Sequence, residues 1–390
     1  MSTTAPALRY LRGDRTIWFI FFALVIFSVL SVYSSTGLLA YKLHGGNTEY
    51  LLLKHTGLLA VGLGVAYLAY RVDYKRFGLL APWMLVLSIV LLVLTLLFGI
   101  EINDARRWLQ LPVIGVRFQP SDFAKIGIIV YLARAISATQ DRISDGKKVF
   151  APVILPVIVV CGLIAPSDLS TSLMLLLTCW VMLFIGRLPM KYLAGFVAAG
   201  LVMFALLVFI GTVFPEAVRL GTWTSRLQEF FGGEGGYQVQ QAKIAIANGE
   251  FLGEGMGKSV QRNYLPTPYA DFIYAIICEE YGLLGAGLVI ALFLWLFLRT
   301  CRLLTKSTKV FGALMACGLS LLLVMQALAN IAVAVNLFPV TGLPLPIVSL
   351  GGTSLVFSCL AFGIILSVSR YVEATGRLKR GRAAVTAEAA

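Results

Sequence analysis

Residues 271–298 read DFIYAIICEEYGLLGAGLVIALFLWLFL, an apolar segment of membrane-spanning length that begins with an aspartate. An α-helix needs about 20 apolar residues to cross the hydrocarbon core of a bilayer. The preceding residues, 264–270, read YLPTPYA, and their two prolines oppose helix formation. We therefore expect Asp271 to lie where a helix enters the membrane. A carboxylate is costly there and is a candidate for function.

The rest of the chain also has the composition of an integral membrane protein. Of its 390 residues, 59% are hydrophobic and 13% are charged, which is more apolar surface than a soluble core can bury. The apolar runs lack the alternation of a β-barrel, so an all-α polytopic fold is predicted. Ten spans are expected at about residues 17–37, 51–70, 79–99, 121–138, 151–166, 168–186, 193–212, 271–298, 311–338 and 346–369. They form one membrane domain, residues 1–370, followed by a flexible tail, residues 371–390.

The distribution of lysine and arginine predicts the orientation. An even number of spans places both termini on one side, and that side carries most of the basic residues, which makes it cytoplasmic. These residues include Arg9, Arg12, Arg15, Arg71, Lys75, Arg76, Arg187, Lys191, Arg299, Arg302, Lys306 and Lys309. We attribute the net charge of +13 to this bias, so membrane lipids rather than nucleic acid are expected around the chain.

Two predicted outer loops, residues 100–120 and 213–270, stand out by length or composition. The second contains enough aromatic residues to be ordered, and its piece YQVQQAKIAIAN, Tyr237–Asn248, predicts a short amphipathic helix at the membrane interface. The string GEGMG, residues 253–257, follows no strand, so it is interpreted as a turn rather than a nucleotide-binding loop.

Few ionisable residues lie within the predicted spans, and each is a functional candidate. They are Asp122, Lys125, Asp168, Asp271, Glu279 and Glu280. Asp122 and Lys125 share a helix face, and their pair serves either packing or substrate. Asp271 is either a helix N-cap or a reactive group. Glu279 and Glu280 lie roughly 12–14 Å deeper than Asp271 at 1.5 Å per residue, too deep for the same chemistry without a water-filled cavity.

Two further stretches at the outer surface have unusual composition. Residues 105–125 read ARRWLQLPVIGVRFQPSDFAK. Their arginines suit either phosphate or interface anchoring, and Pro120 with Ser121 predicts a helix start. Residues 339–354 read PVTGLPLPIVSLGGTS. Irregular backbone at membrane depth must be buried or line a cavity, so this stretch predicts either a pocket wall or a re-entrant connection.

Together these motifs resemble the SEDS family (shape, elongation, division and sporulation) over about residues 13–370. The resemblance rests on RRWLQL with QPSDFAK, on GEGMGKSVQRNYLPTPYADFIYAIICEEYG and on PVTGLPLPIVSLGGTS. The strings GDRTIW, SVYSSTG and GMGKSVQ are more similar to its division members than to its elongation members. The chain departs from the family by having QPSD at Asp122, where QPSE or QPAE is usual. It also has PSD before Leu169, where QPD or EPD is usual.

The resemblance implies a peptidoglycan glycosyltransferase that polymerises lipid II during septal wall synthesis. It would act in the bacterial cytoplasmic membrane with a class B penicillin-binding protein and other divisome proteins. Asp271 matches the family's catalytic aspartate and would act as general base in an inverting transfer. Arg107, Lys125, Lys258 and Arg262 would stabilise the diphosphate. The other substrate-binding candidates are Trp108, Gln119, Ser121, Asp122, Asp168, Gln261, Glu280, Gly351, Gly352 and Ser354.

No cofactor motif is recognisable, and a divalent cation, Mg²⁺ or Mn²⁺, is compatible with a diphosphate leaving group. Three alternatives stay open: an elongation-type polymerase, a flippase or transporter for lipid II, and a non-catalytic scaffold of the division machinery. A transporter would place its substrate residues near the bilayer midplane. Here the polar motifs lie on the outer loops, which favours an enzyme.

Overall fold

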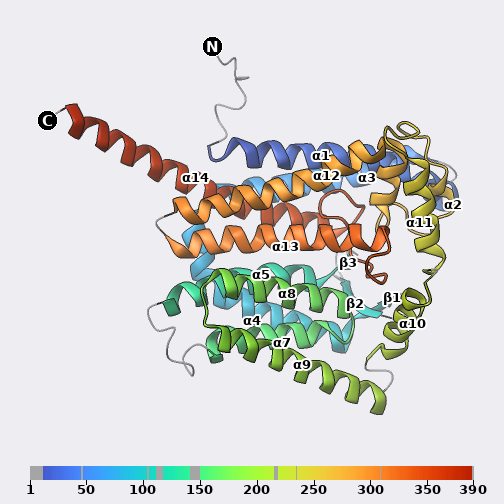
Figure 1. The fold of residues 1–390 in the computed structure, drawn as a ribbon, viewed down its shortest axis with the longest axis horizontal. Helices are drawn as coiled ribbons and strands as arrows, with labels where there is room; N and C mark the ends of the chain where they lie inside the picture. Colours follow the sequence, from blue (N-terminus) through green and yellow to red (C-terminus); the bar gives the residue numbers. More distant parts are fainter. Residues whose placement is uncertain are drawn as a thin grey trace.

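The computed structural model describes residues 12–44, 47–102, 105–110, 117–140, 150–214, 218–233, 235–307 and 309–388, and most of them are helical (Figure 1). The helices are α1 (Arg15–Ser35), α2 (Gly37–His44), α3 (Thr48–Arg71), α4 (Tyr74–Phe98), α5 (Pro120–Thr139), α7 (Leu155–Ile164), α8 (Leu169–Ile185), α9 (Met190–Val213), α10 (Leu220–Phe231), α11 (Tyr237–Asn248), α12 (Ile273–Lys306), α13 (Val310–Ala334) and α14 (Thr353–Glu388). A π-helical turn, Phe150–Ile154, precedes α7, and a 3₁₀ turn, Gln261–Asn263, precedes α12.

Each of the ten predicted spans overlaps one of these helices. Within the described residues, seven helices are long and apolar enough to cross a membrane: α1, α3, α4, α9, α12, α13 and the Thr353–Thr375 part of α14. The helices α7 and α8 are shorter apolar helices, and α5 carries Asp122, Lys125 and Arg134. The helical membrane class is therefore confirmed, and the count of ten spans stays a prediction.

The helices run side by side along the long axis of the molecule, and its two ends differ (Figure 1). The start of α1 and the far end of α14 lie at one end, where an Arg299–Asp14 ion pair and an Arg370–Arg71 hydrogen bond join basic segments. The strands, α2, α10 and α11 gather at the other end. This arrangement agrees with the predicted orientation, although the side that faces the cytoplasm stays a prediction.

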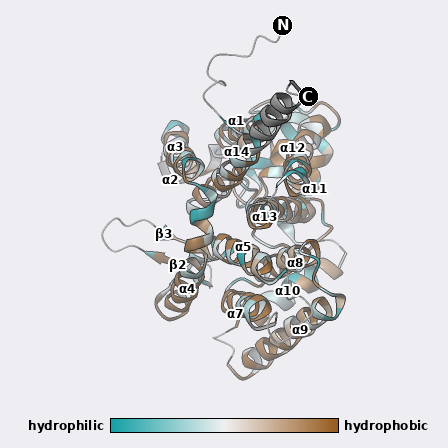
Figure 2. Cartoon of the chain, turned by 90° about the vertical axis from the view of Figure 1, so that its left-hand side faces the viewer, coloured by the Kyte–Doolittle hydropathy of each residue, from teal (hydrophilic) through white to brown (hydrophobic). Residues whose placement is uncertain are grey.

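Helix α13 forms the centre of the bundle, and α9 lies at its edge. In the apolar window of α13, 83% of the residues are buried inside the protein, against 17% in α9. The outlying helices α4 and α9 are strongly hydrophobic along their length (Figure 2), and Trp83 and Phe209 are exposed on them. Apolar side chains that point away from a protein core are typical of helices that face lipid.

A small antiparallel sheet follows α4 where the sequence had indicated only an outer loop. Its strands are β1 (Ile100–Ile102), β2 (Ala105–Gln110) and β3 (Arg117–Phe118), in the order β1-β2-β3. Ile100 pairs with Trp108, and Leu109 pairs with Phe118. The sheet fixes the position of β2, which carries Arg107 and Trp108.

The chain between α13 and α14, residues 335–352, is irregular. The predicted spans 311–338 and 346–369 are therefore shorter here, because α13 ends at Ala334 and α14 begins at Thr353. Prolines lack the N–H that a helix interior requires, and Asn336 and Ile347 have positive φ angles of 59° and 66°. The backbone must therefore leave the helical conformation throughout this segment.

The predicted helix Tyr237–Asn248 is confirmed as α11. It packs on α12 and α13 through a cluster that includes Val239, Ala242, Phe272 and Ile276. Helix α10 was not predicted. At the other end of the chain, α14 continues through most of the expected tail, to Glu388, and the flexibility of residues 371–390 stays a prediction.

Candidate active site

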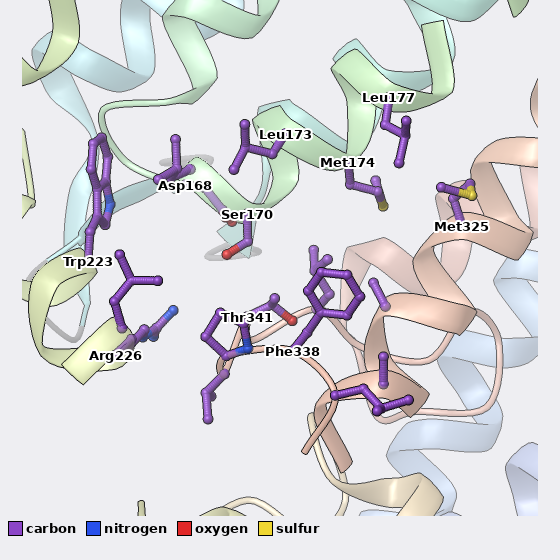
Figure 3. Close-up of a pocket in the computed structure, with 18 of the residues that line it drawn as sticks. Asp168, Ser170, Leu173, Met174, Leu177, Trp223, Arg226, Met325, Phe338 and Thr341 are labelled. Atoms are coloured by element: carbon purple, nitrogen blue, oxygen red, sulfur yellow. The ribbon is translucent and has the colours of Figure 1, made fainter. Parts of the chain in front are cut away.

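A cavity of about 720 Å³ lies between α8, α10, α13 and residues 335–352. Its wall is mostly apolar and includes Leu173, Met174, Trp223, Met325 and Phe338. Figure 3 shows α8 on one side of the cavity, α10 on another, and Phe338 and Thr341 approaching from the irregular segment. A pocket wall was predicted at residues 339–354, and four residues from the start of this stretch, Pro339, Val340, Thr341 and Leu343, line the cavity.

Four charged side chains also line the cavity: Arg107, Asp168, Arg219 and Arg226. A cavity of this size is typical of small-molecule sites. Apolar walls combined with arginine side chains suit an amphiphile that has a hydrocarbon part and an anionic group, because arginine forks pair well with phosphate oxygens. The cavity therefore has the chemistry of a site for a lipid-linked anion.

Asp168 and Arg107, both predicted site residues, are brought together. The Arg107 Nη1 and Asp168 Oδ2 atoms are 3.3 Å apart, and Arg107 Nε donates to the Ser167 carbonyl at 2.8 Å. Asp168 is also the N-cap of α8, since its Oδ1 accepts from the Thr171 N–H at 3.1 Å. Negative charge is stabilised at a helix N-terminus, so Asp168 is held by the start of α8 and in turn holds Arg107.

Asp271 lies in the turn before α12, beside the cavity. The N-cap of α12 is Phe272, and no side chain caps this helix, so the alternative that Asp271 is the N-cap is wrong. A Cβ atom placed on Gly342 would lie 3.8 Å from Asp271 Oδ2. Because Gly342 stands between Thr341 and Leu343, which line the cavity, the carboxylate is adjacent to the cavity wall.

The charges around Asp271 act on its pKa in opposite directions. Burial raises the pKa of Asp271, the positive charges of Arg226 and Arg107 lower it, and the negative charge of Asp168 raises it again. The net result is a raised pKa, because desolvation of the ionised form is the largest effect. A carboxyl with a raised pKa is closer to the ideal for a general base near neutral pH.

Burial and the neighbouring charges also shift the pKa of Arg226. Burial lowers the pKa of its guanidinium, and the neighbouring charges of Arg107 and Arg219 lower it further, whereas Asp168 and Asp271 raise it. Three guanidinium groups and two carboxylates therefore interact around one part of the cavity. Such an excess of positive charge is complementary to an anionic ligand.

The predicted ion pair between Asp122 and Lys125 is present on α5. Lys125 Nζ lies 2.8 Å from Asp122 Oδ1, and both side chains are buried. Lys125 Nζ also donates to Gln326 Oε1 at 3.2 Å, and Gln326 Nε2 donates to the Pro344 carbonyl at 2.9 Å. The pair thus joins α5 to α13 and the irregular segment. These contacts favour the packing alternative, and substrate binding by the pair stays a prediction.

A second group of predicted site residues lies where α5 and α14 begin. Helix α5 starts at Pro120, as predicted, with Gln119 as its N-cap residue. Gln119 Nε2 donates to Ser121 Oγ at 3.0 Å, and the Gln119 N–H donates to Thr353 Oγ1 at 3.4 Å. Gly351, Gly352 and Ser354 flank Thr353 in the sequence. Their contact with a substrate stays a prediction.

Glu280, Gln261, Arg262 and Lys258 lie elsewhere, where residues 249–263 fold onto α12. Ser34 Oγ donates to Glu280, and Arg262 Nη1 donates to the Ser34 carbonyl at 3.0 Å. The Gln261 N–H donates to Glu279 at 3.3 Å. Lys258 is exposed. None of these four residues is among the described residues that line the cavity. Two of the cations predicted for the diphosphate, Lys258 and Arg262, are therefore not in the cavity wall with Arg107.

Sequence reasoning did not identify Arg219, Trp223 or Arg226 as site residues. All three belong to α10 or its first cap position. The signal was present in Leu220–Phe231, LGTWTSRLQEFF, where Leu220, Trp223 and Leu227 recur at helical spacing. The glycines and polar residues around this stretch concealed the pattern within a long loop.

The described residues offer no group of three or more histidine, cysteine, aspartate or glutamate side chains that could hold a metal ion. Asp168 and Asp271 are near one another, but arginines surround them. The predicted Mg²⁺ or Mn²⁺ ion therefore does not fit a protein site in the described part of the chain.

Comparison with known proteins identifies the family. The profile of the FtsW/RodA/SpoVE family, described as "Cell cycle protein", matches residues 14–374. The chain belongs to this family. A "Probable peptidoglycan glycosyltransferase FtsW" of Trichlorobacter lovleyi is 34% identical, with 93% of this chain and 94% of the relative covered. "Stage V sporulation protein E" of Bacillus subtilis is 33% identical, with 89% and 94% covered.

Solved structures of FtsW/RodA/SpoVE proteins or their complexes have the same fold. A chain from "Structural coordination of polymerization and crosslinking by a peptidoglycan synthase complex" superposes with a TM-score of 0.70 at 26% identity, covering 93% of this chain and 99% of that one. The rod shape determining protein RodA of Thermus thermophilus gives a TM-score of 0.66 at 26% identity, covering 93% and 98%. The predicted SEDS resemblance is thereby confirmed.

Proposed function

We propose that this protein is a peptidoglycan glycosyltransferase that polymerises lipid II into glycan strands, with Asp271 as the general base. One observation carries the proposal: Asp271 lies beside a large apolar cavity whose wall also bears Arg107, Arg219 and Arg226. Relatives named peptidoglycan glycosyltransferase support the reaction class. The cavity supplies what a polyprenyl diphosphate sugar requires, which is apolar surface for the lipid and positive charge for the diphosphate.

The stereochemistry of the substrate fits a single carboxylate base. The donor sugar is α-linked to the diphosphate and the product is β-linked, so one inverting displacement is sufficient. Asp271 accepts the proton of the acceptor's 4-hydroxyl while that oxygen bonds to the anomeric carbon of the donor. The bond from this carbon to the diphosphate oxygen breaks, and the polyprenyl diphosphate leaves. General-base catalysis of this kind contributes about 10²- to 10⁴-fold to the rate.

The leaving group needs positive charge rather than a proton. A diphosphate gains negative charge on the oxygen that is released from the anomeric carbon, and preorganised cations stabilise that charge strongly in a site with little water. Arg226 and Arg107 both interact with Asp271, which puts them near the reacting groups. Asp168 fixes the guanidinium of Arg107 by their ion pair.

The proposal includes an orientation and a cellular setting. Ten spans, cytoplasmic termini and an outward-facing cavity would present Asp271 on the side where lipid-linked sugars are used. The basic residues at the opposite end of the bundle support this orientation. A class B penicillin-binding protein is proposed as partner, supported by the synthase complex among the structural neighbours. Relatives named FtsW support a role at the septum with other divisome proteins.

The proposal is tested by polymerisation of lipid II by the purified protein with its transpeptidase partner. We expect Asp271→Asn to lower the rate of glycan formation by about 10²- to 10⁴-fold, because the amide cannot accept the proton. Asp73→Asn is the matched control. Asp73 is the N-cap of α4 at the other end of the bundle, and asparagine caps equally well. A polymerising Asp271→Asn protein would remove Asp271 from the mechanism.

A further inference from the structure

Asn330, near the end of α13, connects the Asp271 turn to the cavity wall. Its side chain is 1% exposed. The amide nitrogen, Nδ2, donates to the Asp271 carbonyl at 2.7 Å and to the Leu343 carbonyl at 2.7 Å. Leu343 lines the cavity. A single side chain therefore uses both of its N–H groups to join two segments that are distant in the sequence.

Two other contacts hold the same segments together. Ser349 Oγ donates to the Ala270 carbonyl at 2.6 Å, and the Leu350 N–H donates to the Tyr269 carbonyl at 2.9 Å. The turn at residues 269–271 thus lies against residues 343–350 through consecutive carbonyls. Of the described hydrogen bonds, only that from Asn330 reaches the carbonyl of Asp271. This bond therefore holds the main chain of Asp271, the residue whose side chain is the carboxylate.

The orientation of the Asn330 amide follows from its donors. Its oxygen, Oδ1, is buried and has no hydrogen-bond partner within the described residues. An asparagine amide has two N–H donors and one acceptor oxygen, and two carbonyl acceptors require the nitrogen to face them. A leucine of similar size has no donor, and an ionised aspartate would place negative charge against both carbonyls.

We infer that Asn330 is the positioning residue of the site: it fixes Asp271 relative to the cavity through the main chain, without contact to the substrate. The inference rests on the proposed function, because it assumes that the Asp271 carboxylate reacts. A base must be held within hydrogen-bond reach of the hydroxyl that it deprotonates. A displacement of about 1 Å costs about 10²-fold in rate, so losing this bond has a large effect on turnover.

The test measures kcat and KM for lipid II with Asn330→Leu and Asn330→Asp, each purified with the transpeptidase partner. We expect kcat to fall about 10²-fold while KM changes by less than about twofold, because the lining side chains remain. Ser320→Ala is the control. Ser320 is also buried on α13 and bonds to Thr300 Oγ1 at 2.6 Å. Ser320 precedes Asn330 by roughly 15 Å along α13 at 1.5 Å per residue, so we expect Ser320→Ala to keep the normal kcat.

The pH profile separates positioning from loss of folded protein. Displacing Asp271 changes its distance from Arg226 and Arg107, so the midpoint of the rate against pH should move in the Asn330 variants. A smaller folded fraction lowers the rate equally at every pH. A normal kcat and an unmoved midpoint in both variants would overturn the inference. That result together with an inactive Asp271→Asn protein leaves the proposed function standing, whereas an active Asp271→Asn protein overturns both.

Discussion

Asp271 and Glu279 lie eight residues apart in one sequence motif, yet their carboxylates have opposite surroundings. Glu279 is fully buried and accepts hydrogen bonds from Ser259 Oγ and from the Val260 N–H at 3.2 Å and the Gln261 N–H at 3.3 Å. Asp271 is partly exposed. No hydrogen-bond donor among the described residues reaches its carboxylate oxygens, and its pKa is raised by burial.

The difference matches the separate roles proposed for the two acids, Glu279 as a structural group and Asp271 as a reactive one. A buried carboxylate whose oxygens accept several hydrogen bonds holds the groups that donate to it in place. One beside a cavity, with arginines at a distance and no direct donor, can exchange a proton with a substrate. Glu279 thus anchors residues 259–261 on α12, where Gly282 interrupts the helix with a φ of 64°, whereas Asp271 has the surroundings that the proposed general base requires.

The comparison is tested most strongly by removing the buried acid. We expect Glu279→Ala to lower the free energy of unfolding by about 1–3 kcal/mol, because the N–H groups of Val260 and Gln261 and the hydroxyl of Ser259 lose their acceptor. Thermal unfolding in detergent measures the effect, with Glu254→Ala as control, since the Glu254 side chain is exposed. Unchanged unfolding would mean that the segment is held by its backbone contacts alone.

Much of the fold could be predicted because apolar length and helix-start chemistry are local properties. The positions of the apolar helices, the start of α5 at Pro120 and the bounds of α11 were predictable from the sequence, and the count of ten spans stays a prediction. The wall at residues 339–343 was also predictable, since prolines and a glycine at membrane depth need either burial or a cavity. The sheet at residues 100–118 was not predicted, because two of its strands, Ile100–Ile102 and Arg117–Phe118, have only three and two residues.

The site was only partly predictable because it is assembled from distant segments. Asp271, Arg107 and Asp168 were candidates, but the sequence could not show that the Arg107 side chain, on β2, reaches Ser167 and Asp168 at the start of α8. Arg226 reaches the cavity because α10 folds back over it, which no local pattern specifies. The contact of Glu280 with Ser34 on α1 is likewise visible only in three dimensions, and substrate binding by Glu280 stays a prediction.

Arg226 offers a way to sharpen the electrostatic side of the comparison. Its positive charge lowers the pKa of Asp271, so we expect Arg226→Gln to raise that pKa. The pH profile of the polymerisation rate should then move to higher pH by about one unit or less, which corresponds to at most about 1.4 kcal/mol. Arg226→Lys keeps the charge and should keep the midpoint. Rates measured from pH 5 to 9 give the answer, and a shift to lower pH would contradict the assigned sign.

The smallest expected effect concerns stability. The pKa of Asp271 is raised in the folded protein, so its contribution to stability is present below the unfolded pKa, about 3.9, and is lost as pH rises through the folded pKa. Asp271→Asn removes this titration. Its unfolding temperature relative to wild type should therefore increase as pH rises from about pH 4 towards pH 8. Glu279→Gln supplies the contrast. Its amide nitrogen is a donor where the Glu279 carboxylate has an acceptor oxygen, so this variant should be less stable than wild type. A pH-independent difference for Asp271→Asn would mean that the carboxyl is as well solvated when folded as when unfolded.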